Sequence, residues 1–540
     1  MILVISKEAQ KPKVSIVVEQ AFDMLAWKEK RGMDRRDFIK GMTLAGVVAT
    51  GAGVVGCAPT APQSGESNTE GKLASASAIE PVEVIDTDIA VVGAGVSGLS
   101  AAIEAREQGV EVVVLEKQPQ CGGNGVIVEC VFAKDSKLQK EMGIEFPLSQ
   151  VLAGEQDMAR YLGDITAWRN LASQSAANID WLMSHGVKFA TVDDYSGFSH
   201  VACAHEFEGG GAAAMETLAA AAKDAGAQFM METSGDQLII DEEGNVTGVY
   251  ALNKAGEYLQ INAKAVLLAT GGFQGNPEMM AERGYPEDNC FDEGMPGHTG
   301  DGLRMAIAAG GADVSMKRTH ITAQSLRDWP VSGKKVFSLA DPGDYVWVNQ
   351  DGLRFANESC GLECPVYPPN AIFSQERSYS LFDNDFLERY DAVQDVADAV
   401  AGDSVGDKFT ADTLDELAEM AGIDPIALKS TVEHYNECCA KGEDDEFGKS
   451  ADLMFPIQTP PYYLLHKIVR FMCTIGGIHT NNHMQVIDMA RKPISGLYAI
   501  GVDGCELYVT AYTLGIAGSA NANNVYSGRV AVQHAVENCL

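Results

Sequence analysis

Residues 86–117 read DTDIAVVGAGVSGLSAAIEAREQGVEVVVLEK. An apolar run leads into the motif Gly93-x-Gly95-x-x-Gly98, and a segment of helical composition follows it. A second apolar run then ends at Glu116. A strand, a glycine-rich turn, a helix and a second strand ending in an acid make up the βαβ unit that binds dinucleotides. This order of features predicts an α/β fold with a Rossmann-like domain.

The residue types of this unit indicate how a dinucleotide would bind. Gly93 allows the tight turn, Gly95 lets the backbone approach a pyrophosphate, and Gly98 lets the helix pack closely on the strand. The N-terminus of the helix favours the anionic diphosphate. The carboxylate at the end of the second strand accepts hydrogen bonds from a ribose diol. The predicted cofactor contacts in this unit are Gly93, Ala94, Gly95, Gly98, Glu116 and Lys117.

An export signal is predicted upstream of the βαβ unit. Residues 34–40 read DRRDFIK, a twin-arginine pattern, and an uncharged apolar run occupies residues 41–56. This run is shorter than the roughly 20 residues of a membrane span, so it is typical of a signal peptide. Cys57 follows small residues, as at a lipoprotein processing site. We therefore expect export to the cell envelope, with a lipid anchor at Cys57 on the outer side of the cytoplasmic membrane. An ordinary cleaved signal is the alternative.

The flanks of this signal, which spans residues 33–57, carry little information. Residues 1–32 precede a plausible start at Met33, and no function is drawn from them. Residues 58–85 are rich in Ser, Ala, Pro and Glu and lack apolar periodicity, which predicts a flexible linker.

The charge balance excludes one class of partner. The chain has 40 Lys and Arg against 75 Asp and Glu, a formal net charge of −35. Nucleic acid is therefore not an expected partner, because binding to phosphates needs a basic surface. The same field opposes the approach of a small dianion unless local positive charge offsets it.

The cysteines predict neither a metal centre nor an electron-transfer chain. None of the twelve cysteines forms a Cys-x-x-Cys pair, so haem attachment and ferredoxin-type clusters are not expected. We predict no metal site, and reduced, mostly buried thiols, the adjacent Cys438 and Cys439 among them. Electrons must then come from an external donor.

The rest of the chain changes character twice. Strand-like runs and helical patterns, one of them at residues 156–185, continue to residue 315. The next segment is richer in aromatic residues, proline and charge, and has a helical stretch at residues 413–440. Strand and glycine features then return. We predict a Rossmann-like cofactor domain, residues 86–315 and 472–540, interrupted by an inserted α+β capping domain, residues 316–471.

Further motifs follow the βαβ unit in order: Gly122-Gly123-Asn124, Ala269-Thr270-Gly271-Gly272, Thr299-Gly300-Asp301-Gly302, Val348-Asn349-x-x-Gly352-x-Arg354-Phe355-x-Asn357-Glu358 and Gly496-Leu497-Tyr498-Ala499-x-Gly501. Together they resemble the FAD-dependent fumarate reductase/succinate dehydrogenase flavoprotein superfamily. More narrowly, they are similar to its exported single-subunit members, which include 3-ketosteroid dehydrogenases and urocanate reductases. The resemblance implies FAD as the cofactor. It places further FAD contacts at Gly122, Gly123, Asn124, Ala269, Thr270, Gly271, Gly272, Thr299, Asp301, Gly501, Gly515 and Ser519.

The resemblance also shows which charged groups are missing. Fumarate reductases use an arginine as proton donor, a Glu and an Arg that relay protons, an arginine that clamps a carboxylate and a histidine that binds substrate. Of the family's positions of this kind, only His320 keeps its residue. A dicarboxylate is therefore not the expected substrate. The positions that correspond to the missing groups hold Leu362, Ser338, Asp341, Tyr512 or Thr513, and Cys473 or Met472.

Tyrosines are the alternative source of catalysis. In the ketosteroid dehydrogenases a tyrosine stands about eleven residues past the glycine of the Gly-Leu-Tyr-Ala motif, and Tyr512 stands eleven residues past Gly501. A phenol can polarise a carbonyl or deliver a proton without carrying charge. We predict Tyr512, His320 and Tyr508 as catalytic residues. Tyr512 could instead pack against the flavin, His320 could be structural, and Tyr508 could lie on the surface.

The hypothesis is an exported FAD-dependent oxidoreductase that reduces a C=C bond conjugated to a carbonyl or an aromatic group. A small organic acceptor and an envelope cytochrome or quinol-linked donor would be its partners. A 3-ketosteroid-type dehydrogenase is the first alternative. A fumarate or urocanate reductase with an unrecognised arginine (Arg304, Arg318, Arg327 or Arg470) is the second. A flavin electron-transfer subunit without substrate chemistry is the third.

Overall fold

The computed structural model describes residues 79–159, 161, 164–195, 199–285, 287–315, 320–326, 343–363, 367–394, 397 and 407–540, apart from 505, 506, 509–511 and 513. Residues Pro81–Leu540 form one compact unit, which carries every element below. The predicted signal, Cys57 and most of the predicted linker lie outside the described residues. Within the described ranges, no helix is both long and apolar enough to span a membrane.

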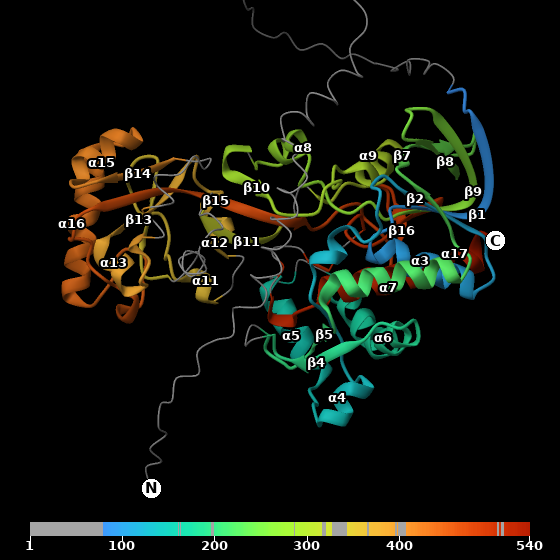
Figure 1. Cartoon of the computed structure of the whole chain (residues 1–540), viewed down its shortest axis with the longest axis horizontal. Coiled ribbons are helices and arrows are strands. Elements are labelled where there is room, and N and C mark those ends of the chain that lie inside the picture. The colour runs from blue at the N-terminus through green and yellow to red at the C-terminus, as the bar shows by residue number, and fades with distance from the viewer. Residues whose placement is uncertain are drawn as a thin grey trace, which may run out of the picture. The chain divides into compact units, whose positions relative to one another are not determined.

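The largest sheet has eight strands and includes strands from both ends of the unit (Figure 1). Its path runs β16-β17-β9-β1-β2-β6, with β8 beside β9 and β7 beside β8. Five of these strands are parallel. Because β17 pairs with β9, the C-terminal segment completes the sheet that the βαβ unit begins, as predicted. The strands are β1 (Glu83–Val92), β2 (Val112–Glu116), β6 (Gln228–Met231), β7 (Ser234–Ile240), β8 (Val246–Leu252), β9 (Tyr258–Leu268), β16 (Gln485–Ile487) and β17 (Pro493–Ala499).

Strand β2 and the C-terminal halves of β1, β9 and β17 are buried on both faces, which is why they read as continuous apolar runs. Successive side chains of a strand alternate between faces. Ile89 and Val91 of β1 accordingly join one hydrophobic cluster, whereas Ala90 and Val92 join another. Three helices pack beside one another on the first face (Figure 1). They are α3 (Val96–Glu107), α7 (Gly210–Asp224) and α17 (Ser519–Asn538).

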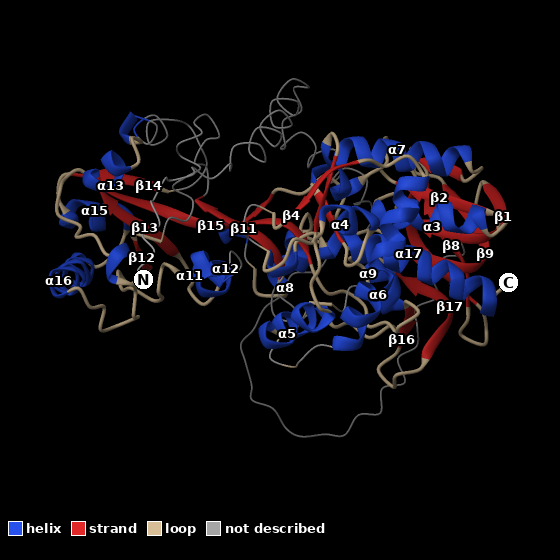
Figure 2. Cartoon of the chain, turned by 90° about the horizontal axis from the view of Figure 1, so that it is seen from below, coloured by secondary structure: helices blue, strands red, loops and turns tan. Residues whose placement is uncertain are grey.

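A six-stranded sheet forms the capping domain around the long strand β15. The helices α15 and α16 pack beside it (Figure 2). Trp347 belongs to one core with Phe382, whereas its neighbours Val346 and Val348 belong to another, with residues of α15 and α16. The elements are β10 (Cys290–Asp292), β11 (His320–Leu326), β12 (Val346–Asn349), β13 (Ser378–Asp383), β14 (Lys408–Ala411), α15 (Leu414–Ala421), α16 (Pro425–Lys441) and β15 (Tyr462–Thr474).

Strand β15 connects this capping sheet with the cofactor loops. It pairs with β13 and β14 near its start and with β10 and β11 near its end. Its last residue, Thr474, accepts a hydrogen bond at Oγ1 from the Phe273 N–H, 3.0 Å away. One strand thus begins in the capping core and ends at the predicted FAD loop. Because β10 precedes residue 316 yet belongs to this sheet, the domain boundaries themselves stay a prediction.

A buried charge network occupies the centre of the capping domain. Arg354 binds Glu358 through two hydrogen bonds of 2.9 Å and Asp444 through two of 3.0 Å. The side chains of Arg354 and both carboxylates are at most 1% exposed. Lys449 lies 3.4 Å from Glu358 and donates to the Tyr345 carbonyl oxygen. The network ties the residues after β12 to the loop after α16, so this family motif holds the fold together.

Some expected elements differ from the observed ones at their boundaries. The stretch 413–440 forms two helices, because the chain turns at Gly422 and a new helix starts at Pro425, where Asp424 caps the Ile426 N–H. The stretch 156–185 is likewise broken, and α6 (Ile165–Ser184) starts after α5 (Leu148–Met158) has ended. The predicted linker 58–85 ends too late, since β1 begins at Glu83 through backbone pairing with β9. That pairing requires no apolar side chains.

Replacing the buried arginine should destabilise the capping domain strongly. In Arg354→Met, two buried carboxylates lose their shared cation, so we expect a loss of about 3–5 kcal/mol in the free energy of unfolding. Urea unfolding followed by circular dichroism measures it. Lys429→Ala removes an exposed partner of Asp415 in the same domain and should cost less than about 1 kcal/mol. Equal stability of the two variants would contradict a central role for the network.

Candidate functional site

The glycine turn between β1 and α3 is fixed by close backbone contacts. Gly93 has a φ of +111°, and a Cβ there would lie 2.3 Å from the Ala269 carbonyl oxygen. A Cβ at Gly98 would lie 1.9 Å from the Gly93 carbonyl oxygen. At Gly95, by contrast, the nearest protein atom would be 3.9 Å away. Gly93 and Gly98 are thus required by the fold, whereas the room above Gly95 suits a diphosphate at the start of α3.

Glu116 ends β2 beside this turn. Its Oε2 accepts a hydrogen bond from the Ala94 N–H at 2.8 Å, and its Oε1 accepts one from the Gln118 N–H at 2.7 Å. Burial raises the pKa of this carboxyl, while these backbone donors act in the opposite direction. The carboxylate therefore orders the glycine turn itself, and its further lone pairs fit a ribose diol.

The other predicted FAD loops converge on β1 and β2 from distant parts of the chain. The Lys117 ammonium lies 2.7 Å from the Thr299 hydroxyl and 2.6 Å from an Asp301 oxygen. Arg304 binds the second Asp301 oxygen at 2.6 Å. Both cations are thus engaged with one carboxylate at the start of α9 (Asp301–Ala308). Since Arg304 is held there, it is a poor candidate for a substrate-binding arginine.

Asn124 has a structural role that the sequence did not suggest. Its Oδ1 accepts a hydrogen bond from the Met295 N–H and its Nδ2 donates to the Met472 carbonyl oxygen, both at 2.7 Å. The Gly122-Gly123-Asn124 loop is therefore tied to the end of β15. Met472 and Cys473, which stand where the family has a histidine, lie at this junction.

His298 is a residue of the cofactor loops that sequence reasoning missed. It is buried beside Gly123 and Gly271, at which a Cβ would lie 3.7 Å and 3.1 Å from its ring. Burial lowers the pKa of His298 to about 4, so the ring is neutral. Its Nδ1 has no hydrogen-bond partner within the described part of the chain. A buried ring nitrogen that can still form a hydrogen bond fits a polar cofactor at this junction. Its position directly before Thr299 was the available signal.

Asp503 is a second residue that sequence reasoning missed. The Thr270 N–H donates to its Oδ2 at 2.5 Å, and the Thr270 hydroxyl donates to the same oxygen at 3.0 Å. That hydroxyl accepts a hydrogen bond from the Gly302 N–H. Asp503 thus joins the loop after β9, the start of α9 and the loop after Gly501. Burial raises the pKa of this carboxyl to about 7, although its hydrogen bonds with Thr270 lower it.

The predicted C-terminal tyrosines form one buried aromatic group. Tyr508 and Tyr512 meet edge to face with their ring centroids 5.0 Å apart, and Trp168 packs on Tyr508 at 5.6 Å. The Tyr508 hydroxyl donates to Ser519 Oγ at 2.7 Å. Tyr508 is therefore a buried support, not a surface residue. Burial raises the pKa of Tyr512 far above its usual range, so its phenol stays protonated.

The remaining predicted site residues either contact other parts of the protein or lie outside the described residues. Gly501 donates its N–H to Ser527 Oγ, and the Gly515 carbonyl oxygen accepts from the His200 N–H. Ser519 is the first residue of α17, and its Oγ accepts a hydrogen bond from the Tyr508 hydroxyl. His320 pairs with Thr474 through the β11 backbone, and its side chain is not described. Ser338, Asp341, Thr513, Arg318 and Arg327 lie outside the described residues, and Arg470 is described through its backbone only.

A group of acidic residues lies on and next to a small sheet that no motif marks. The sheet consists of β3 (Cys130–Phe132), β5 (Ala204–Phe207) and β4 (Phe189–Asp193), in that order. The Tyr195 hydroxyl donates to Glu129 at 3.2 Å. Burial and the neighbouring carboxylates raise the pKa of Glu206, while burial raises that of Glu129. Cys130, next in the chain to Glu129, and Tyr195 both lie within electrostatic range of the Tyr512 hydroxyl.

Comparison with known proteins agrees with this arrangement. Residues 88–518 match the family model described as FAD binding domain. The chain belongs to this family of FAD-binding proteins. Its relatives include a vinyl phenol reductase from Lactiplantibacillus plantarum, 29% identical over 83% of this chain and 96% of that protein. A probable fumarate reductase from Shewanella frigidimarina is 31% identical over 87% of this chain and 78% of that protein.

A solved structure gives the same result for the fold. The open conformation of a flavocytochrome c3 fumarate reductase matches with a TM-score of 0.64 and 27% identity, covering 85% of this chain and 79% of that one. The protein is thus an FAD-dependent oxidoreductase related to enzymes that reduce C=C bonds. The glycine turn, Glu116 and His298 fit this cofactor.

The buried carboxyl of Asp503 should make stability depend on pH. The folded flavin-free chain keeps a proton up to a pKa of about 7, whereas the unfolded chain releases it near 3.8. The resulting stabilisation is complete below the lower pKa and is lost as the pH rises through the higher one. From pH 5 to pH 8, Asp503→Asn should therefore gain about 2–3 kcal/mol relative to the parent protein in urea unfolding. A difference that does not change with pH would contradict this assignment.

Proposed function

We propose that the protein is an exported, FAD-dependent reductase of a C=C bond conjugated to an aromatic ring or a carbonyl group. Its substrate carries no carboxylate that must be clamped. Electrons come from an external donor in the cell envelope, a cytochrome or a quinol-linked system. The observation that carries this proposal is the buried, neutral phenol of Tyr512, which interacts with Cys130 and with Tyr195, the hydrogen-bond partner of Glu129.

Charge is the first part of the argument. Glu129, Asp193 and Glu206 interact electrostatically with one another and with Cys130, which in turn interacts with Tyr512. A fumarate dianion placed there would meet like charges in a poorly solvated site, which costs free energy unless cations offset it. A neutral phenol or ketone meets no such penalty. Its hydroxyl could donate a hydrogen bond to Glu129, as Tyr195 does.

Proton delivery is the second part. When bound and reduced by the external donor, FAD would supply the hydride chemistry at one carbon of the double bond. The neighbouring carbon then needs a proton or the carbonyl needs a hydrogen bond, and a protonated phenol provides either. Tyr512 remains neutral because of its burial, while Tyr508 and Ser519 hold its ring and loop in place. Tyr512 is the catalytic residue in this scheme, and Tyr508 positions it.

The relatives support this class of substrate. The match to the vinyl phenol reductase extends over nearly all of that protein, and vinyl phenol carries a C=C bond on a neutral aromatic ring. The match to the probable fumarate reductase supports the reductive direction. Export rests on the twin-arginine pattern at residues 34–40, and the lipid anchor rests on Cys57.

Reoxidation of the reduced flavin would test the substrate class. The flavin is reduced chemically under anaerobic conditions, and its absorbance is followed as acceptors are added one at a time. We expect rapid reoxidation by a vinyl phenol or an enone steroid, slower reoxidation by arylacrylates such as urocanate, whose single carboxylate has no clamp, and none by fumarate. Reoxidation by fumarate alone would show that the charge argument is wrong.

A matched pair of tyrosine variants would test the proton donor. Tyr512→Phe should lower turnover about 10²–10⁴-fold, because the donor is lost while the ring remains. Tyr508→Phe removes a hydroxyl that contacts Ser519, and we expect a less than about tenfold change. Flavin content, measured after denaturation, should be the same in both variants. Unchanged turnover in Tyr512→Phe would remove Tyr512 from the mechanism.

A further inference from the structure

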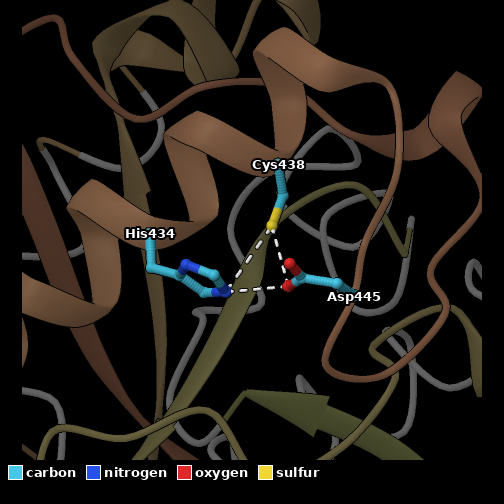
Figure 3. A group of neighbouring side chains, drawn as sticks. All are labelled: His434, Cys438 and Asp445. Atoms are coloured by element: carbon cyan, nitrogen blue, oxygen red, sulfur yellow. Dashed lines mark hydrogen bonds and ion pairs between the residues drawn. The ribbon is translucent and has the colours of Figure 1, made fainter.

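A group of metal-ligand side chains lies in the capping domain, on elements that the FAD site does not use. His434 and Cys438 stand one turn apart on α16, and Asp445 approaches them from the loop that follows (Figure 3). The His434 Nε2 lies 2.8 Å from Asp445 Oδ1 and 3.7 Å from Cys438 Sγ. The third edge, from Cys438 Sγ to Asp445 Oδ1, is 3.4 Å. The three ligand atoms therefore form a compact triangle.

The local sequence explains why these side chains meet. Residues four apart on a helix share a face, which brings His434 next to Cys438. Gly442 then ends α16 in the left-handed conformation and donates its N–H to the Cys438 carbonyl oxygen. The chain folds back over the end of the helix, and the buried contact of Asp444 with Arg354 fixes the returning loop. Asp445 is thereby positioned by a rigid neighbour.

The size of the triangle suits a zinc-type ion. Zinc binds sulfur at about 2.3 Å and nitrogen or oxygen at about 2.0–2.2 Å in tetrahedral geometry. The edges of such a tetrahedron are roughly 3.3–3.6 Å long, close to the two edges that involve sulfur. The edge of 2.8 Å between His434 and Asp445 would lengthen slightly once both atoms bound a metal.

The exposure of the three side chains and the charge around them also favour a bound cation. Cys438 is buried, whereas the side chains of His434 and Asp445 are 38% and 53% exposed. An ion could therefore enter from solvent and keep a water molecule as its fourth ligand. The returning loop carries the further carboxylate Glu443, which adds negative charge, whereas Glu446 is paired with Arg354. A mixed nitrogen, sulfur and oxygen donor set selects a borderline transition metal over magnesium or calcium.

We propose that His434, Cys438 and Asp445 bind one zinc-type divalent cation, which joins the end of α16 to the loop that carries Asp444. This proposal departs from the sequence-based prediction of no metal site, which rested on the lack of paired-cysteine spacing. Binding releases the thiol proton to solvent and forms one metal–sulfur bond, with no change in oxidation state. The ion has a structural role, since it lies on elements of the capping core.

Zinc binding to the full-length flavoprotein tests the proposal. The reduced protein is stripped with a chelator and dialysed against Zn²⁺, and metal per flavin is measured by mass spectrometry. We expect one zinc per chain, and an X-ray absorption spectrum with one sulfur neighbour at about 2.3 Å. Cys438→Ser should lose the sulfur signal and weaken binding by more than the roughly 10–100-fold typical of residues that only support metal ligands.

The adjacent cysteine offers a matched control. Cys439→Ser changes the same helix and should keep both the stoichiometry and the sulfur neighbour. Zinc should also raise the thermal unfolding midpoint of the parent protein and of Cys439→Ser, but not that of Cys438→Ser. Less than stoichiometric zinc in the parent protein would overturn the proposal. A sulfur signal that survives in Cys438→Ser would overturn it as well.

Discussion

The cofactor domain depends on the contact between two strands at the point where both end. At Gly93 the turn after β1 passes so close to the Ala269 carbonyl oxygen that a side chain is excluded. This contact brings the loop after β9 next to the N-terminus of α3. Thr270 then donates a hydrogen bond to Asp503, which lies in the loop after β17. The Rossmann turn and the two later cofactor loops are therefore parts of one assembly around a single backbone contact.

The family motifs divide into two physical classes. The glycines and Glu116 shape a surface that a dinucleotide can occupy. Arg354, Glu358 and Asn124 instead hydrogen-bond to the protein and hold the capping sheet and its junction in place. These structural motifs identify the family well, since any chain with this cap needs them. They carry little information about the substrate, which in the proposed function depends on residues around Tyr512 that no motif includes.

The features that the sequence predicted correctly depend on residues that are close together in the chain. The βαβ unit, the continuous apolar strands and the split of the cofactor domain follow from patterns that neighbouring residues display. His298 and Asp503 were missed because their roles depend on loops brought together by folding, such as Thr270 and Asp503, 233 positions apart. The break in the stretch 413–440 could have been predicted, because a glycine such as Gly422 commonly ends a helix and a proline such as Pro425 commonly begins one. For Glu129 and Tyr195 no local signal exists, because their sheet consists of short strands.

A buried phenol has a clear chemical consequence for the proposed mechanism. Ionisation of Tyr512 is unfavourable because the side chain is buried and Cys130 lies nearby, so the phenol remains neutral. It can therefore donate a hydrogen bond or a proton without first losing a competing ion pair. Cys130 also interacts with the carboxylates of Glu129, Asp193 and Glu206. In the proposed function, the electrostatic environment that keeps Tyr512 protonated therefore also disfavours a dicarboxylate substrate.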